Sequence, residues 1–156
     1  MIMYQIIFSF HSIIRWLLVL GLIGTIMVFA TNRNNEKPAF KLGDIFKSTT
    51  VSFAHIQLIL GYYLYFESPM VKYFRANIKE GLAIPEMTFF GLYHVIMMTI
   101  AVFVLTIGSS IIKRTQTYEL KRKYVLIYFG IVILIIFLAV PWPFSPFISR
   151  PYYRSF

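Results

Sequence analysis

Four long apolar segments, separated by short polar stretches, restrict the folds that are open to this chain. They cover approximately residues 4–30, 51–71, 88–112 and 124–140; the second ends at 66 or at 71, and a Pro-Trp-Pro run stops the fourth. Apolar runs of about 18 residues or more are typical of transmembrane helices. With 58% hydrophobic and 13% charged residues, a soluble domain of 156 residues has too little polar surface. We therefore expect an all-α integral membrane protein, a four-helix up-down bundle that forms one domain over residues 1–156.

The absence of cysteine and the scarcity of acidic residues exclude several functions. Without cysteine the chain has no disulfide, iron–sulfur cluster, thiolate haem ligand or cysteine nucleophile. The 6 acidic residues include no pair within a span, and the sequence has no phosphate-binding loop or nucleophile elbow. Hydrolysis by general acid–base catalysis therefore has no evident machinery. The net charge of +9 comes from basic residues beside the spans, where topology and anionic lipid explain them better than nucleic acid does.

The distribution of Lys and Arg predicts the orientation of the chain in the membrane. The loops after the first and third spans contain nine basic residues, namely Arg33, Lys37, Lys41, Lys47, Lys113, Arg114, Lys121, Arg122 and Lys123. The opposite side contains five, namely Lys72, Arg75, Lys79, Arg150 and Arg154. Basic residues favour the cytoplasmic side. We therefore expect both termini outside, in the periplasm, for a multi-pass protein of the bacterial inner membrane.

A short amphipathic segment lies between the second and third spans, over residues 70–80. Val71, Phe74 and Ile78 fall at helical spacing, and basic residues stand between them. This pattern predicts a short interfacial helix on the outer membrane surface. Such a helix is either a membrane anchor for its loop, or a docking surface or lid over a site.

Each of the first three spans contains one histidine, and the chain has no other. Inserting an ionisable side chain into a span costs roughly 2–3 kcal/mol, so it usually has a function and a partner. From the helical rise of about 1.5 Å per residue, His11 and His94 lie about 7 Å and about 9 Å below the outer hydrocarbon edge. Two imidazoles at matched depth on different helices are a suitable pair of axial haem ligands.

His55 is expected at a different depth, about 16 Å or about 24 Å below the same edge, depending on where the second span ends. The ligands of a single metal ion must lie within roughly 2–2.6 Å of it, so a three-histidine zinc or copper site is not expected. His55 would instead be a secondary or alternative haem ligand. For each of the three histidines, a hydrogen bond to a neighbouring polar group or carbonyl remains an alternative.

Arg15 follows His11 by four residues and therefore projects from the same helix face, one turn deeper. A guanidinium at that depth needs a counter-charge, which a haem propionate would supply through bidentate hydrogen bonds. The alternatives are an ion pair with Glu67 or Glu86, or extension of the side chain to lipid phosphate.

Other polar and small residues in the spans have two interpretations each. Gln57 is expected to bond another helix, and with Tyr62, Tyr63 and Tyr65 it would line a quinone pocket; the tyrosines alternatively form an interfacial belt. Glycines allow close helix packing, and a haem between helices also needs glycine where the macrocycle lies flat. The glycines within the spans are Gly21, Gly24, Gly61, Gly91, Gly108 and Gly130.

Four short motifs give the chain a resemblance to a known family. They are His-Ser-x-x-Arg-Trp at 11–16, His-Ile-Gln-Leu-Ile-Leu-Gly at 55–61 followed by Tyr65-Phe66, His94 with Met97-Met98, and Pro-Trp-Pro-Phe at 141–144. Over most of the chain these motifs resemble short bacterial membrane proteins usually labelled small cytochrome b. The resemblance implies four helices and a b-type haem, without fixing which histidines ligate the iron. The chain has no motif for covalent haem attachment, which agrees with a b-type cofactor.

The expected function is electron transfer through one haem b. His11 and His94 would be the axial ligands, Arg15 would pair with a propionate, and His55 would be a secondary or alternative ligand. A six-coordinate iron has no free site for oxygen, so we expect an electron carrier rather than a stand-alone enzyme. The expected partners are membrane lipid and either the quinone pool or another membrane redox protein or complex, and a homo-oligomer remains open.

Two other functions remain open at this point. In the first, the chain is a non-redox subunit or assembly factor of a larger inner-membrane complex, and its histidines and Arg15 form interhelical hydrogen bonds. In the second, it resembles haem-modifying or quinol-oxidising membrane enzymes, with His55 near a substrate.

Overall fold

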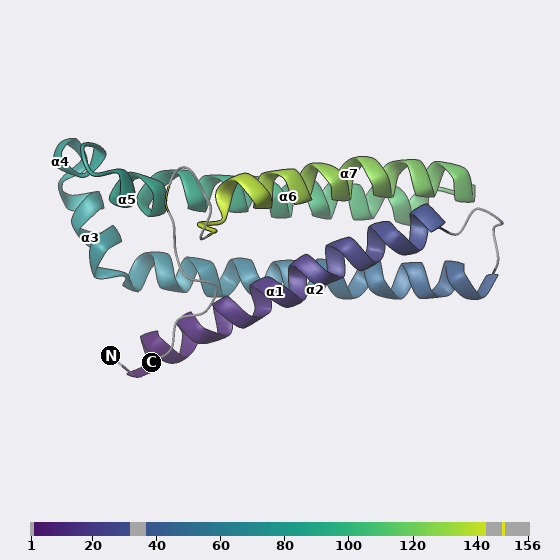
Figure 1. Cartoon of the computed structure of the whole chain (residues 1–156), viewed down its shortest axis with the longest axis horizontal. Helices are drawn as coiled ribbons and strands as arrows, with labels where there is room; N and C mark the ends of the chain where they lie inside the picture. The colour runs from purple at the N-terminus through teal and green to yellow at the C-terminus, as the bar shows by residue number, and fades with distance from the viewer. Residues whose placement is uncertain (1, 32–36, 143–147, 149–156) are drawn as a thin grey trace.

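Four long helices dominate the computed structural model, which describes residues 2–31, 37–142 and 148. The helices α1 (Ile2–Thr31) and α2 (Lys37–Glu67) lie side by side, as do α6 (His94–Arg114) and α7 (Tyr118–Ala139) (Figure 1). Further contacts join α1 to α7 and α2 to α6, so each long helix touches two others. The connection from α2 to α6 contains α3 (Pro69–Ala76), α4 (Ile78–Leu82), α5 (Pro85–Thr88) and the π-helix η1 (Phe89–Tyr93). The described part of the chain contains no strand, so the all-α prediction is confirmed there.

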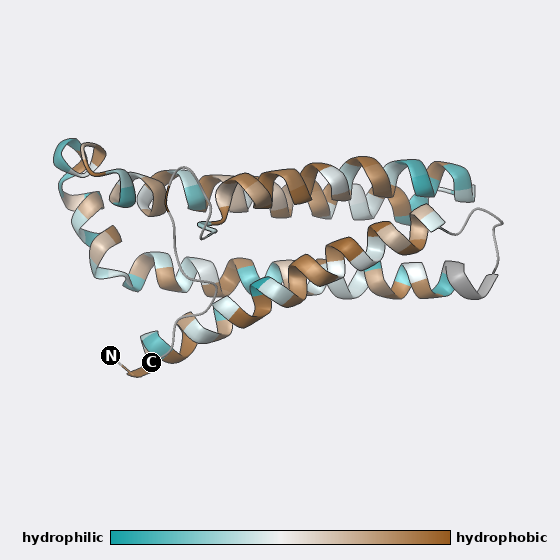
Figure 2. Cartoon of the chain, viewed as in Figure 1, coloured by the Kyte–Doolittle hydropathy of each residue, from teal (hydrophilic) through white to brown (hydrophobic). Residues whose placement is uncertain are grey.

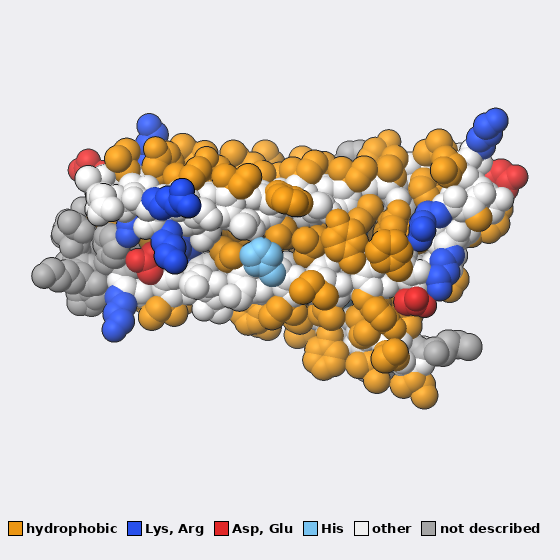
Figure 3. Space-filling view, turned by 180° about the vertical axis from the view of Figure 1, so that it is seen from behind, with side chains coloured by type: hydrophobic (Ala, Val, Ile, Leu, Met, Phe, Trp, Pro, Cys, Tyr) orange, Lys and Arg blue, Asp and Glu red, His pale blue; other side chains and the backbone are white. Residues whose placement is uncertain are grey.

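Three stretches of the described chain are long and apolar enough to cross a membrane. They are Ile2–Thr31, Pro85–Arg114 and Tyr118–Ala139, while α2 does not reach the same apolarity. Apolar residues occupy the middle of the long helices, and hydrophilic residues concentrate toward the ends of the molecule (Figure 2). One whole face has apolar side chains along its middle and Lys and Arg at both ends (Figure 3). This distribution is typical of a membrane protein.

The predicted end of the second span at 71 is wrong, because α2 ends at Glu67. Ser68 has an extended backbone, with φ −62° and ψ 122°, and its side chain accepts the hydrogen bond from the amide of Val71. Pro69 then occupies the first turn of α3, where its missing N–H costs nothing. The sequence Ser-Pro therefore ends one helix and begins the next. The helix α7 ends at Ala139, one residue before the predicted end of the fourth span and just ahead of the proline signal.

The amphipathic segment over residues 70–80 is helical, but it is two helices rather than the single one predicted. The chain breaks at Asn77, where φ is −131° and ψ is 60°, between α3 and α4. Val71 and Phe74 are buried as the spacing predicts, whereas Ile78 lies beyond the break and is 56% exposed. The helical periodicity therefore holds over α3 only.

Phe74 fixes α3 against the beginning of the third long helix. Its ring packs on Gly81 of α4 and on Gly91 of η1, and a Cβ added at either glycine would overlap the ring. Both positions therefore require glycine for a close approach. Because η1 runs directly into α6, this contact also holds the turn that precedes His94.

A hydrogen bond spans the break between α3 and α4, because the hydroxyl of Tyr73 donates to Glu80 at 2.9 Å. This bond and the negative charge of Glu80 raise the pKa of Tyr73 above its ordinary value of 10.0. A pKa raised by folding means that the contact stabilises the folded chain below about pH 10 and is lost as the pH rises through the folded-state pKa. We expect Glu80→Gln to lower the pKa of Tyr73 in a near-ultraviolet absorbance titration, read as the difference from Tyr73→Phe. An unchanged titration would contradict the contact.

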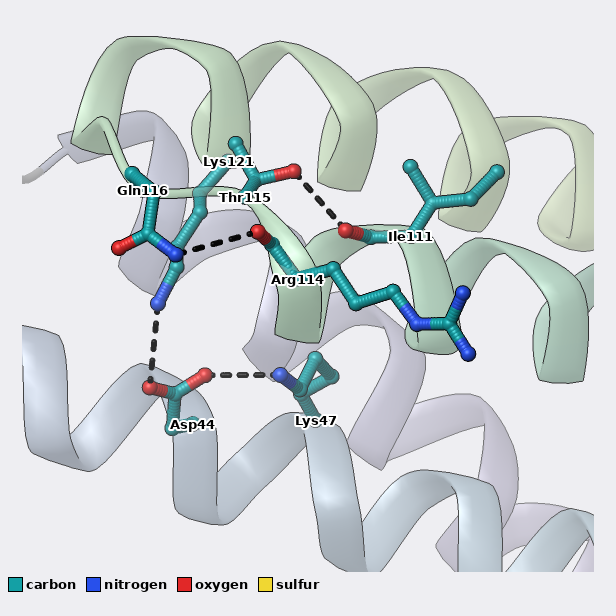
Figure 4. A network of polar contacts seen from close by, with 7 residues as sticks. All are labelled: Asp44, Lys47, Ile111, Arg114, Thr115, Gln116 and Lys121. Atoms are coloured by element: carbon teal, nitrogen blue, oxygen red, sulfur yellow. Dashed lines mark hydrogen bonds and ion pairs between the residues drawn. The ribbon is translucent and has the colours of Figure 1, made fainter.

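The end of the molecule opposite α3 is organised by polar contacts around Asp44 (Figure 4). Asp44 on α2 forms ion pairs with Lys47 at 2.8 Å and with Lys121 on α7 at 3.8 Å. The C-terminal end of α6 is closed by the Thr115 hydroxyl, which donates to the Ile111 carbonyl at 2.9 Å. The basic residues at this end belong to the side predicted to be cytoplasmic.

Some residues used in the charge and motif predictions lie outside the described part of the chain, namely Arg33, Pro143, Phe144, Arg150 and Arg154.

Candidate cofactor site

A cavity of about 470 Å³ lies between the long helices and is walled mainly by apolar side chains. Its volume falls in the range of roughly 300–1,000 Å³ that is typical of ligand and cofactor sites. Along α6 the wall runs from just before His94 to Leu105, which is roughly 20 Å at the helical rise. The polar side chains on the wall include His11, Arg15, Gln57 and His94.

His11 and His94 reach this cavity from helices that lie diagonally opposite each other. His11 is on α1 and His94 is the first residue of α6, and each of these helices packs between α2 and α7. The prediction that the two imidazoles reach one interior from different helices agrees with this arrangement.

The π-helix η1 sets the direction of His94. The amide of His94 bonds the carbonyl of Phe89, five residues earlier, where an α-helix would use Phe90. A single π turn of this kind shifts the helix register and often occurs at functional sites. Nothing in the sequence analysis predicted it.

The imidazole of His94 is held by the carboxyl end of α7. Its Nδ1 lies 2.7 Å from the carbonyl oxygen of Ala139. A carbonyl only accepts hydrogen bonds, so Nδ1 carries the proton and Nε2 keeps its lone pair. A ring N–H donated to a backbone carbonyl is the usual outer contact of a metal-ligating histidine. His94 is therefore in the tautomer that a ligand to iron through Nε2 would need.

Tyr65 of α2 supports the same turn, because its hydroxyl donates to the carbonyl of Gly91 at 3.1 Å. The Tyr65 hydroxyl therefore supplies the donor that a backbone carbonyl within the π turn needs. We expect Tyr65→Phe to destabilise the protein by about 0.5–1.5 kcal/mol, since it removes one hydrogen bond. Thermal unfolding in detergent would measure the loss. A variant as stable as the parent would show that Tyr65 does not support η1.

His11 lies with one edge of its ring against Gly61 of α2. A Cβ at Gly61 would be 3.3 Å from Cε1 and 3.8 Å from Nδ1 of the ring, so glycine leaves the room that the imidazole occupies. Nδ1 is buried and has no hydrogen-bond partner among the described residues. The backbone of His11 is bonded to α2 as well, because Gln57 Nε2 donates to its carbonyl at 2.9 Å.

Arg15 lies beside two aromatic rings, those of Trp16 and Trp142. Its guanidinium carbon lies 5.5 Å from the ring centroid of Trp16 and 5.9 Å from that of Trp142. Both distances suit cation–π attraction. Trp142 is in turn fixed by its indole N–H, which donates to the Phe137 carbonyl at 2.9 Å. In the sequence, Trp142 belongs to a helix stop and to the motif at 141–144, and neither pattern predicts its contact with Arg15.

His55 is not brought to this site. Its side chain is exposed on the outside of the helices, and its Nε2 lies 3.1 Å from the hydroxyl oxygen of Thr106 on α6. The Thr106 hydroxyl donates to the Val102 carbonyl, so it accepts the proton of His55. His55 therefore makes the interhelical hydrogen bond that was the alternative to a cofactor role.

The tyrosines are divided between the cavity and other positions. Tyr62 and Tyr65 line the cavity, and the hydroxyl of Tyr62 is hydrogen-bonded to that of Thr99 at 2.8 Å; Tyr63 is not on the wall.

Glu67, one of the partners considered for Arg15, forms an ion pair with Lys72 at 3.1 Å. Among residues 2–31 and 37–142, no group of three or more His, Cys, Asp or Glu side chains could hold a metal ion.

The residues of the cavity fit a haem. Two imidazoles approach from diagonal helices, one of them in the ligand tautomer, and a guanidinium on the wall can balance a carboxylate. The remaining wall is mainly apolar and would exclude water.

Comparison of the chain with profiles of known protein families, with curated proteins and with solved structures finds no match.

Proposed function

We propose that this protein is a b-type cytochrome of the bacterial inner membrane, with four spans in an up-down bundle and both termini in the periplasm. One haem b would be bound between His11 and His94. The observation that supports this most strongly is the hydrogen bond from His94 Nδ1 to Ala139, which leaves Nε2 free on the wall of a cavity that His11 also lines. When bound, the haem supplies one-electron oxidation and reduction at its iron.

The chain's own residues supply ligation and charge balance. His94 and His11 would hold the haem iron through one ring nitrogen each, and an iron held in this way would have no vacant site for oxygen. Arg15, which lies beside the rings of Trp16 and Trp142, would balance the charge of a propionate. His55 has no role in this proposal.

The remaining cavity wall controls access to the site. Apolar side chains such as Met98, Leu105, Val132 and Ile136 keep water from the interior. Electrons would then be exchanged with partners in or beside the membrane, either the quinone pool or a second membrane redox protein.

A reduced-minus-oxidised absorption spectrum of the detergent-purified protein, with a haem-to-protein ratio, tests this function. We expect sharp α and Soret bands at about one haem per chain, since the two histidines on the cavity wall would hold one haem. A colourless protein, after expression with added haem, would overturn the proposal.

A second candidate function is a non-redox subunit or assembly factor of a larger membrane complex. Two interhelical hydrogen bonds favour it, from His55 to Thr106 and from Gln57 to the His11 carbonyl, because they use polar groups for helix packing. This alternative predicts a colourless protein that copurifies with a larger assembly.

A further inference from the structure

Two buried polar atoms on adjacent helices have no hydrogen-bond partner among the described residues. These two, out of four such atoms among the described residues, are Nδ1 of His11 and Oε1 of Gln57, and both residues line the cavity. Leaving one such atom unsatisfied costs about 1–3 kcal/mol, so native proteins rarely keep one without a reason. Here the two side chains belong to residues that already touch, through the bond from Gln57 Nε2 to the His11 carbonyl.

The two atoms are chemically complementary. The amide oxygen of Gln57 only accepts hydrogen bonds, and Nδ1 of His11 donates when Nε2 is the nitrogen that carries the lone pair. Their positions also agree. The Nδ1 edge of the ring faces Gly61, which follows Gln57 by four residues and therefore shares its face of α2.

The contact at His94 shows what His11 lacks. At His94 the Nδ1 proton is held by a backbone carbonyl, which fixes both the tautomer and the orientation of the ring. His11 has no backbone acceptor for the same proton within the described chain. Gln57 Oε1 is the acceptor that remains beside it.

We propose that Gln57 is the positioning residue of His11: its Oε1 accepts the Nδ1 proton through one bridging water, while its Nε2 keeps the bond to the His11 carbonyl. The contact leaves Nε2 of His11 as the nitrogen that binds a metal. This inference rests on the proposed haem site. It gives the two ligands different supports, a fixed backbone carbonyl for His94 and a side-chain amide for His11.

The consequence is a dependence of haem affinity and reduction potential on residue 57. An acceptor on the outer nitrogen makes the imidazole a stronger donor to iron, which favours the oxidised state. Gln57→Leu removes the acceptor, so we expect haem affinity to fall about 10–100-fold and the midpoint potential to rise. Gln57→Glu keeps an acceptor and adds charge, so we expect it to retain haem and to lower the potential.

The experiment compares the full-length protein with Gln57→Leu, Gln57→Glu and Tyr62→Phe. The last variant is a control for loosened packing, because Tyr62 also makes an interhelical bond on the cavity wall. Haem affinity and midpoint potential are measured on loaded protein. The tautomer of His11 is measured by ¹⁵N NMR on haem-free protein, and the His11 signal is identified by its absence in His11→Gln. We expect the proton on Nδ1 in the parent and in Gln57→Glu, but not in Gln57→Leu.

Each outcome is decisive. A parent that binds no haem overturns the proposed function, and the tautomer measurement still tests the pair formed by Gln57 and His11. A parent that binds haem, with affinity, potential and tautomer unchanged in Gln57→Leu, overturns this inference alone. Equal changes in Gln57→Leu and Tyr62→Phe would likewise overturn it, since a general loosening of the bundle would then explain both.

Discussion

Replacing His94 with alanine is expected to reduce the haem bound per chain at least about tenfold, because losing even an outer partner of a ligand typically costs 10–100-fold. The variant removes the nitrogen that the Ala139 carbonyl holds in place and leaves the iron with one protein ligand. His11→Ala is expected to have an effect of the same order, since the two imidazoles face one cavity. The haem-to-protein ratio and the reduced-minus-oxidised spectrum measure both losses.

His55→Ala is the matched control for these variants. It removes the third histidine of the chain, which is exposed and bonded to Thr106, and it is expected to leave the haem ratio at the parent value. Full haem in both His11→Ala and His94→Ala would show the ligand assignment to be wrong. Loss of haem in His55→Ala, with haem retained in His11→Ala, would show that His55, on the outer face of α2, is a ligand in place of His11.

The long helices could be predicted because membrane insertion leaves a simple signal. Hydropathy located α1 and the C-terminal ends of α6 and α7 within two residues, and the Pro141-Trp142-Pro143 run follows the end of α7. The predicted starts at 88 and 124 differ by six residues from those of α6 and α7. The boundaries of α2 were harder, because the helix begins well before the apolar segment, at Lys37, and ends at Glu67, between the two predicted ends at 66 and 71. Apolarity reports where a span crosses lipid, whereas helix bounds depend on local caps and prolines.

Depth led to the expectation that His11 and His94 lie near one site, because a constant rise per residue converts sequence position into height, and both residues line one cavity. Rotation about the helix axis is harder to read. The apolar pattern of α2 is not clear enough to show that His55 points outward while Gln57 points inward. Depth therefore made His55 a possible ligand, and its helix face separates it from the cavity.

Contacts between distant segments could not be predicted from local patterns. The π turn before His94 depends on Phe74 packing against Gly91 and on the hydroxyl of Tyr65, both from other helices. Arg15 likewise meets Trp142 only because the end of α7 lies beside α1. In each case the signal lies in tertiary packing, which a single sequence does not display.

The glycines on α6 and α7 provide a second large expected effect, on stability rather than on haem. Gly108 is buried against Tyr128 of α7, and a Cβ at this position would overlap the side chain of Tyr128. Gly130 on α7 has no atom within 4 Å of its would-be Cβ. Both positions are helical, so the same change to alanine brings the same gain in helix propensity and differs only in packing.

We expect Gly108→Ala to destabilise the protein by about 1–3 kcal/mol, the usual cost of overpacking a filled contact. Gly130→Ala is expected to be neutral or to stabilise it by up to about 1 kcal/mol. Unfolding of both variants in detergent, followed by circular dichroism, measures the difference. In a membrane the lipid is as apolar as the helix surface, so close packing rather than burial must hold α6 against α7. Equal stabilities of the two variants would contradict this and would show that the α6–α7 contact can open at little cost.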